Sequence, residues 1–338
     1  MKYYLAPTLL FWVFSTAIGQ EIMPPQQPLT GPGGREYVCD SVTFYDMKSR
    51  RQDGYWLFEP RSPMPDSAHV IVFSHGYGSY NPMIYGQWIR HLVRHGNIVI
   101  FPRYQKNLYY PKAKHFAEND AKAIKKALEV LRTQPNHTRP ITTQFTLVGH
   151  SYGGTVSALL AAEYQRFGIP KPMAVMLVQP GTSKLKGGRL ADYSNIPTDT
   201  KLFIITSQED WVVGDELGEI VFRTATKTPQ RAWVKLYRDF HGSVDLHALH
   251  AEPYSMDYAF DSGMRNYTAK RAIRRNRLNT IDYYAFWMRL DALLDCTRIN
   301  QNCNICFGNT PTQSDMSVWS DGIPVRPLKI QEERLNDE

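Results

Sequence analysis

The sequence has few cysteines, no internal repeat and, beyond its first twenty residues, no apolar run long enough to cross a bilayer. Only four cysteines occur among the 338 residues, and nothing marks a second domain boundary. The lack of a long apolar run excludes membrane spans in the body of the chain. No motif of a nucleic-acid-binding module is present either, so the formal net charge of +7 is poor support for a nucleic-acid partner.

The first residues follow the pattern of an export signal. The segment MKYYLAPTLLFWVFSTAIGQ places Lys2 ahead of an apolar stretch and small residues at Ala17 and Gly19. This pattern predicts a signal peptide over 1–19. A membrane anchor is the alternative, but the apolar run is short for a span and contains Pro7. We therefore expect a soluble exported protein, either secreted or periplasmic.

The rest of the chain divides by composition into three parts. Residues 20–34 are polar and rich in proline and glycine, which indicates a flexible N-terminal segment. One large domain is expected over 35–295, because this length can bury a sizeable core. A cysteine-containing extension follows over 296–338, and we expect it to pack on the body of the domain.

The four cysteines are Cys39, Cys296, Cys303 and Cys306. In an exported protein they predict two disulfides, one in the C-terminal tail and one joining that tail to the N-terminal region. We favour Cys296 with Cys303, because a bridge between Cys303 and Cys306 is tight. A four-thiolate zinc site is the competing interpretation, since Cys303 and Cys306 have ligand spacing. Zinc ribbons usually pair two such knuckles, however, and this chain has one.

Short apolar runs alternate with amphipathic segments along the domain. The runs are continuous and rich in valine and isoleucine, as in parallel strands that are covered on both faces. Expected strands are 69–76, 97–104, 145–151, 173–181, 201–210 and 231–242, and expected helices are 116–132, 152–167, 214–225 and 280–295. The segments REYVCDSVTFYD and GYWLFEP look like an antiparallel pair before them. This order predicts an α/β fold with a mostly parallel central sheet and helices on both faces.

Ser151 stands between an apolar run and a helical segment, in FTLVGHSYGGTVSALLAAEY. Ligand sites of such sheets lie at the carboxyl ends of the strands, and a sharp turn there needs small neighbours such as Gly149 and Gly153. The helix amides and dipole favour negative charge beside the hydroxyl. The segment resembles the nucleophile elbow of the α/β-hydrolase superfamily, and this resemblance implies the α/β-hydrolase fold with Ser151 as nucleophile.

An acyl-transfer enzyme must also stabilise an oxyanion with preorganised amides. The amide of Tyr152, directly after the nucleophile, is one expected donor. The segment HVIVFSHGYGSY contains His75-Gly76-Tyr77-Gly78, which is similar to the His-Gly-x-Gly oxyanion loop of esterases and lipases. That similarity implies the amide of Tyr77 as the second donor.

The superfamily order is nucleophile, acid, histidine. Asp210 ends an expected strand, and its Asp-x-Val-Val sequence resembles the acid loop of the family; Glu209 is the adjacent alternative. His241 follows the next strand in LYRDFHGS and is the predicted general base. His247 and His250 remain alternatives if that strand ends later. With Asp245 these two histidines also offer a metal site, but loop residues without a metal are the favoured interpretation.

The motifs resemble those of secreted esterases of the dienelactone-hydrolase-like, cutinase-like and platelet-activating-factor acetylhydrolase-like group. This resemblance implies a serine hydrolase that cleaves small-molecule or lipid esters through an acyl-enzyme, with no cofactor and no metal. The segment 182–200 is too short for a large lid. A prolyl-oligopeptidase-like serine peptidase is one alternative, although the chain is too short for the propeller domain of those enzymes. A non-catalytic binding protein with the same fold is the other.

Three further features lie outside the expected catalytic residues. The insertion 243–279 carries aromatic and sulfur side chains that either wall an acyl pocket or belong to the core, namely Tyr254, Met256, Tyr258 and Phe260. A basic cluster offers weak contact with an anionic surface, through Lys270, Arg271, Arg274, Arg275 and Arg277. Sequons at Asn136 and Asn266 are glycosylation sites if the host glycosylates exported proteins.

Overall fold

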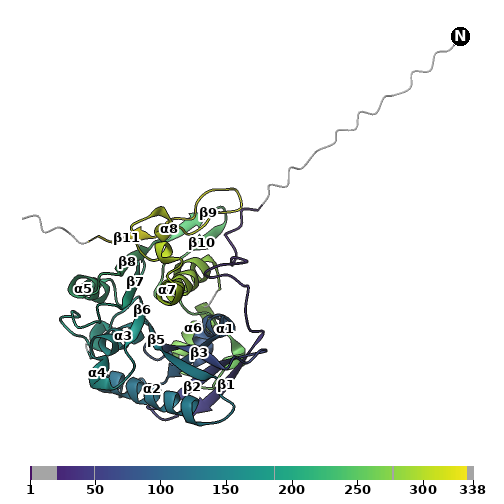
Figure 1. Cartoon of the computed structure of the whole chain (residues 1–338). Coiled ribbons are helices and arrows are strands. Elements are labelled where there is room, and N and C mark those ends of the chain that lie inside the picture. Colours follow the sequence, from purple (N-terminus) through teal and green to yellow (C-terminus); the bar gives the residue numbers. More distant parts are fainter. Residues whose placement is uncertain (2–20, 49, 186, 276–277, 333–338) are drawn as a thin grey trace, which may run out of the picture.

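A mixed sheet forms the centre of the molecule in this computed structural model, which describes residues 1, 21–48, 50–185, 187–275 and 278–332 (Figure 1). The signal peptide predicted over 1–19 lies, Met1 apart, outside these residues. The strands are β1 (Ser41–Met47), β2 (Tyr55–Arg61), β3 (Ser67–Ser74), β4 (Asn97–Pro102), β5 (Arg139–His150), β6 (Pro172–Val178), β7 (Lys201–Ser207), β8 (Arg231–Leu236), β9 (Asp239–His241), β10 (Val244–Leu246) and β11 (Lys329–Ile330).

Nine strands pair in the order β1-β2-β4-β3-β5-β6-β7-β8-β11. The pairs from β4 through β8 are parallel, whereas β1 with β2, β2 with β4, and β8 with β11 are antiparallel. The predicted strands and the antiparallel pair that precedes them are therefore confirmed. One difference is that the expected strand 231–242 ends at Leu236, after which β9 and β10 form a separate hairpin.

Helices cover both faces of the sheet, as predicted (Figure 1). They are α1 (Gly86–Arg94), α2 (Phe116–Thr133), α3 (Tyr152–Ala162), α4 (Tyr164–Phe167), α5 (Glu216–Thr224), α6 (Tyr267–Arg275), α7 (Met288–Ile299) and α8 (Pro311–Ser314). One core lies between the sheet and α1 with α7, and the other between the sheet and α2, α3 and α5. A π-helical segment, Asp282–Trp287, leads into α7. Among the described residues no helix has the length and apolar character needed to span a membrane.

The register of the parallel strands aligns their carboxyl ends. Ser74 pairs with Gly149, and His150 pairs with Val178 in the next strand. Val178 in turn pairs with Ile205, close to the end of β7. The loops that follow β3, β5, β6 and β7 thus leave from one edge of the sheet, where residues far apart in sequence can meet.

The two terminal segments pack against the body of the molecule. The N-terminal segment, predicted to be flexible, accepts a hydrogen bond from Thr280 at the carbonyl of Pro25. At the other end, β11 pairs with β8 as the last strand of the sheet. Trp319 and Leu328 of the same extension are buried in the core beside α7. Both segments are therefore part of the packed structure.

One of the two expected disulfides is present. Cys296 and Cys303 form a bridge, as favoured from the sequence. The second bridge was wrong, because Cys39 and Cys306 are free and buried, with their thiols directed to the carbonyl oxygens of Pro63 and Arg289. The four-thiolate zinc alternative fails for the same reason, since a disulfide consumes two of its ligands.

Candidate active site

Ser151 lies at the turn between β5 and α3, at the carboxyl edge of the sheet. Its backbone has φ 57° and ψ −121°, a conformation that L-residues rarely adopt. The turn is fixed from both sides, because the Ser151 amide donates to the carbonyl of Val178 and its own carbonyl accepts from Gly181. The side chain is 6% exposed, so the strained turn presents a nearly buried hydroxyl.

The small residues around Ser151 are required by close backbone packing. A Cβ added to Gly149 would lie 2.2 Å from the carbonyl oxygen of Gly153. A Cβ added to Gly153 would lie 1.9 Å from the carbonyl oxygen of Ser74, at the end of β3. Both distances are far below any van der Waals contact, so only glycine allows α3 to begin this close to β3 and β5.

His250 lies between Ser151 and Asp210. Its Nε2 atom is 2.9 Å from Ser151 Oγ, and its Nδ1 atom is 2.7 Å from Asp210 Oδ2. The other oxygen of Asp210 accepts hydrogen bonds from the amides of Val212 and Val213, at 3.0 and 3.1 Å. Asp210 is 5% exposed. The carboxylate is thus held by its own loop and orients the imidazole toward the hydroxyl.

His241, the histidine favoured from the sequence, does not reach this site. It belongs to β9, and its Nε2 atom is 2.7 Å from the carboxylate of Asp321 in the C-terminal extension. Its ring packs edge-on against Trp319. The predicted position of the general base is therefore corrected. The histidine beside Ser151 is His250, one of the two alternatives, and not His241. The reason is the β9–β10 hairpin, which inserts residues between the end of β8 and the histidine that enters the site.

Three side chains hold the segment that carries His250. The amide of Ala248 donates to Glu209 Oε2 at 2.9 Å, and Gln179 donates to the carbonyl of Leu249 at 2.9 Å. His150 Nε2 lies 3.0 Å from the carbonyl of His250. Glu209, the alternative acid, therefore positions the backbone before His250 instead of contacting the imidazole. Sequence reasoning gave no role to Gln179 or His150.

A chain of hydrogen bonds connects this segment to the loop after β3. Burial keeps the pKa of His150 well below its ordinary value, so its imidazole is neutral. Its Nε2–H therefore donates to His250, and its Nδ1 accepts from the hydroxyl of Tyr85 at 2.8 Å. The Tyr85 oxygen in turn accepts the amide of Gly76 at 2.9 Å. Through Tyr85 and His150, the Gly76 loop and His250 are positioned together.

The two expected oxyanion donors lie beside Ser151. A Cβ added to Gly76 would be only 3.3 Å from the Cβ of Ser151, so the loop that contains Tyr77 lies against the Ser151 side chain. Among the described residues, the amides of Gly76, Gly78 and Ser79 have hydrogen-bond acceptors and that of Tyr77 has none. Tyr152 is the first residue of α3, where an amide has no acceptor within the helix. Both amides are available to an oxygen anion.

The remaining candidates have structural surroundings. His247 lies 3.4 Å from both Glu209 and Asp245, while His250 is occupied by Ser151 and Asp210. His250 thus points to Ser151 and Asp210, and not to a group formed with Asp245 and His247. Of the proposed pocket wall, three side chains belong to the core and Tyr258 is 63% exposed; the three are Tyr254, Met256 and Phe260.

The two sequons differ in their surroundings. Asn136 is exposed at the start of β5. The Nδ2 atom of Asn266 instead donates to the carbonyl of Gly78 at 2.7 Å, and the Thr268 hydroxyl donates to the carbonyl of Tyr77 at 3.3 Å. The beginning of α6 thus supports the loop above Ser151, and a glycan on Asn266 would remove part of that support.

Comparison with known families agrees with the fold. Residues 61–197 match the model of the chlorophyllase family, an α/β-hydrolase-type family of serine esterases. The matched region runs from the end of β2 past Ser151 and includes the Gly76 loop. No curated protein gave a significant match. The sheet order, the turn at Ser151 and this match together support the α/β-hydrolase fold, with a region over residues 61–197 that is similar to esterases of the chlorophyllase family.

Proposed function

We propose that the chain is an exported serine esterase that cleaves carboxylic esters through an acyl-enzyme on Ser151. The observation that carries this proposal is the continuous contact from Ser151 through His250 to Asp210, at 2.9 and 2.7 Å. A serine hydroxyl is a weak nucleophile, and a neighbouring imidazole that an acid orients is what activates it. The signal pattern of 1–19 and the Cys296–Cys303 disulfide support export.

In the proposed reaction, Ser151 Oγ forms a bond to the ester carbonyl carbon while its proton moves to His250 Nε2. The carbonyl oxygen gains negative charge and accepts hydrogen bonds from the Tyr77 and Tyr152 amides. The bond to the leaving oxygen then breaks, and His250 returns the proton to the departing alcohol. Water, activated by the same imidazole, adds to the acyl carbon and releases the acid. The chemistry requires no cofactor.

The surroundings of the site support an apolar ester as substrate. Exposed aromatic side chains lie close in sequence to the proposed site residues. Trp211, the residue after Asp210, is 87% exposed. Tyr109 and Tyr110 are 87% and 78% exposed and succeed Leu108, whose carbonyl accepts from the Tyr77 hydroxyl. Exposed aromatic side chains in loops beside a site favour binding of an apolar group or a lipid surface.

The basic residues lie on α6, whose Thr268 contacts the carbonyl of Tyr77, and they support contact with anionic surfaces. Lys270, Arg274 and Arg275 are exposed and Arg271 is partly buried, while Arg277 lies outside the described residues. We expect the chain to co-sediment with phosphatidylserine vesicles at low salt and less with phosphatidylcholine vesicles. Binding that is equal for both lipids, or unchanged in a Lys270→Glu/Arg274→Glu variant, would exclude a role for this cluster.

Labelling with a fluorophosphonate probe tests the central proposal. We expect covalent labelling of the wild type and turnover of p-nitrophenyl esters, with both lost in Ser151→Ala. Ser157→Ala is the matched control, because Ser157 is buried on the same helix. A wild type that does not react would favour the non-catalytic binding protein, and turnover of peptides but not esters would favour the peptidase. Equal turnover by Ser151→Ala would exclude Ser151 as the nucleophile.

A further inference from the structure

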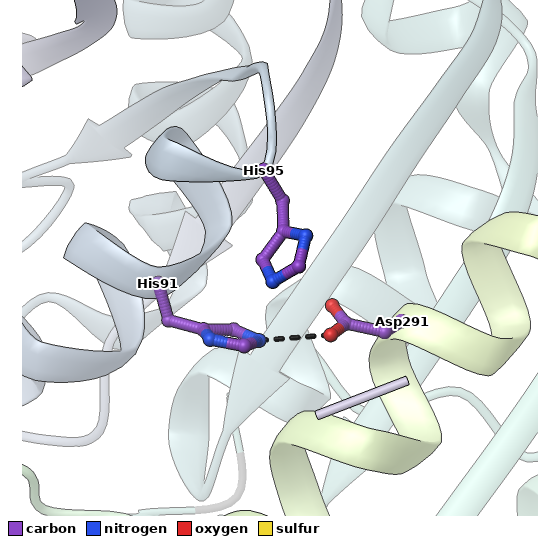
Figure 2. A group of neighbouring side chains, drawn as sticks. All are labelled: His91, His95 and Asp291. Carbon is purple, nitrogen blue, oxygen red and sulfur yellow. Dashed lines mark hydrogen bonds and ion pairs between the residues drawn. The ribbon is translucent and has the colours of Figure 1, made fainter. Parts of the chain in front are cut away.

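A second group of reactive side chains lies between α1 and α7, apart from the Ser151 site. His91 is in the last turn of α1, and His95 is the residue that caps this helix. Asp291 and Asp295 are on α7. Each pair has the i, i+4 spacing that places two side chains on one face of a helix. Figure 2 shows His91, His95 and Asp291 directed toward a common point.

The ligand atoms of this group are close together. One ring nitrogen of each histidine and a carboxylate oxygen of Asp291 all lie within 4.8 Å of one another. The His91 Nε2 to Asp291 Oδ2 distance is 2.8 Å. Ligands of a tetrahedral zinc ion lie about 3.4 Å apart, given metal–ligand bonds of about 2.0–2.1 Å. The partly exposed ring of His95 needs to move by roughly 1 Å to reach that geometry.

The group opens on a hollow lined by further acidic residues. This hollow has a volume of about 240 Å³, and its lining includes His95, Asp291, Asp295 and Glu36. Arg298 also lines it, with its guanidinium donating to Asn97 Oδ1 at 2.8 Å. The lining thus contains three carboxylates and one guanidinium, which gives it an excess of negative charge. A cation that enters therefore meets carboxylates and imidazoles at its inner end.

The surrounding contacts fix the orientation of two ligands. The amide of Gly33 donates to Asp291 Oδ2 at 2.8 Å. The hydroxyl of Tyr37 lies 3.2 Å from His91 Nδ1 and accepts a hydrogen bond from Gln27. A histidine that ligates a metal through one nitrogen usually donates its other N–H to such a partner. His91 and Asp291 therefore each have a further hydrogen-bond partner outside the group. Such partners orient the ligands of a metal site.

His91 is the most deeply buried ligand of this group. It is 1% exposed, so its ring is held in place by the surrounding packing. Without a metal, that ring donates to Asp291, and with one it can shift its proton to Nδ1 and donate to Tyr37.

We propose that His91, His95 and Asp291 bind one divalent transition-metal ion of the Zn²⁺ class, with Asp295 or water as the fourth ligand. Two imidazole nitrogens and a carboxylate oxygen suit zinc and its neighbours, whereas Mg²⁺ and Ca²⁺ prefer oxygen ligands alone. The ion would replace the His91–Asp291 hydrogen bond and compete with the contact between His95 Nε2 and the Gly34 carbonyl, which is 3.1 Å long. It would join α1 to α7, and so act as a structural ion.

Metal titration of the full chain after treatment with a chelator tests this site. We expect one equivalent of Zn²⁺ to bind and to raise the Tm, because a ligand that binds the folded state stabilises it. When Co²⁺ is bound in place of Zn²⁺, it should give the visible absorption of a four-coordinate ion. His95→Ala should weaken binding at least tenfold, and circular dichroism checks that this variant folds. His95 is partly exposed, so its removal leaves the core intact.

Two other histidines provide the controls. His115 is exposed beside Glu118, and His247 lies between Glu209 and Asp245. His115→Ala should bind Zn²⁺ as the wild type does. The proposal is overturned if the wild type binds no Zn²⁺ or Co²⁺, if His95→Ala retains wild-type affinity and stoichiometry, or if His247→Ala abolishes the binding instead.

Discussion

The Nε2 atom of His250 lies 2.9 Å from the Oγ atom of Ser151, although ninety-nine residues separate the two in the sequence. The contact exists because the carbonyls of Leu249 and His250 are held by side chains at the ends of β6 and β5, namely Gln179 and His150. His250 therefore comes to Ser151 on a short docked segment, not at the end of a sheet strand.

Replacing His250 tests whether it is the base. His250→Ala should lower kcat for ester hydrolysis by about 10⁴–10⁶-fold, the range seen when a triad member is removed. His241→Ala should change kcat by less than about two-fold, because an exposed ion pair such as that with Asp321 contributes little. Steady-state kinetics on a p-nitrophenyl ester measures both variants. A larger loss in His241→Ala than in His250→Ala would return the base to the position favoured from the sequence.

Two of the three proposed triad positions were predictable because parallel strands end at one edge of the sheet. Ser151 and Asp210 each follow a buried apolar run directly, so the rule for strand ends located both. The same rule did not locate the histidine, His250. The run RAWVKLYRDFHG looks like one strand, but β8 ends at Leu236 and β9 turns away into a separate hairpin. His241, His247 and His250 lie within a stretch of ten residues, and only the packing of 248–250 distinguishes them.

The pairing of the C-terminal extension with the sheet and the group of His91, His95 and Asp291 could not be predicted from the sequence. β11 has only two residues, so no alternation of apolar and polar residues could predict it as a strand. The helix α1 was not among the expected helices, so the i, i+4 relation of His91 and His95 was not visible. Their proximity to Asp291 depends on contact across two hundred residues. Local pattern predicts elements well, whereas contacts between distant elements require the fold itself.

The hydroxyl of Tyr85 should matter for catalysis although it does not contact substrate in the proposed reaction. Tyr85→Phe removes the acceptor of the Gly76 amide and the donor to His150. Two buried polar groups lose a partner, so the free energy of unfolding should fall by about 1–3 kcal/mol. The Gly76 loop and His250 should both become less well positioned, which lowers kcat by about tenfold with little change in KM.

Denaturant unfolding and steady-state kinetics measure these two effects of Tyr85→Phe. Tyr284→Phe is the control, because Tyr284 is also buried and donates its hydroxyl to the carbonyl of Gln26, outside the Ser151 site. That variant should lose stability but keep its kcat. Equal kcat in Tyr85→Phe and the wild type would show that Tyr85 has only a structural role.

The Cys296–Cys303 bridge should stabilise the end of α7 modestly. Its sequence separation is 7 residues, and a loop of this size restricts the unfolded chain by about 2–3 kcal/mol. Cys296→Ser/Cys303→Ser should lower the free energy of unfolding by that amount. Thiol titration of the unfolded, unreduced wild type should find the thiols of Cys39 and Cys306 alone. Finding no free thiol would mean that the second bridge forms after all.

Asp120 should make the stability depend on pH. It is fully buried on α2, where Oδ2 accepts the Ser74 hydroxyl at 2.8 Å and Oδ1 has no partner among the described residues. Burial raises its pKa from 3.8 to about 7. Between these values the folded chain holds a proton that the unfolded chain has lost. This contribution is therefore fully present below about pH 4 and disappears as the pH rises through about 7.

Asp120→Asn should remove that dependence, because the amide has the same shape and does not ionise. Between pH 4 and 7 the free energy of unfolding should fall less steeply than in the wild type, by up to about 1.4 kcal/mol per pH unit. Burial also raises the pKa of Glu252 and Asp282, so part of the slope should remain. Urea unfolding at several pH values measures it, with Asp199→Asn at the surface as control. If Asp120→Asn has the slope of the wild type, the carboxyl of Asp120 does not titrate in this range.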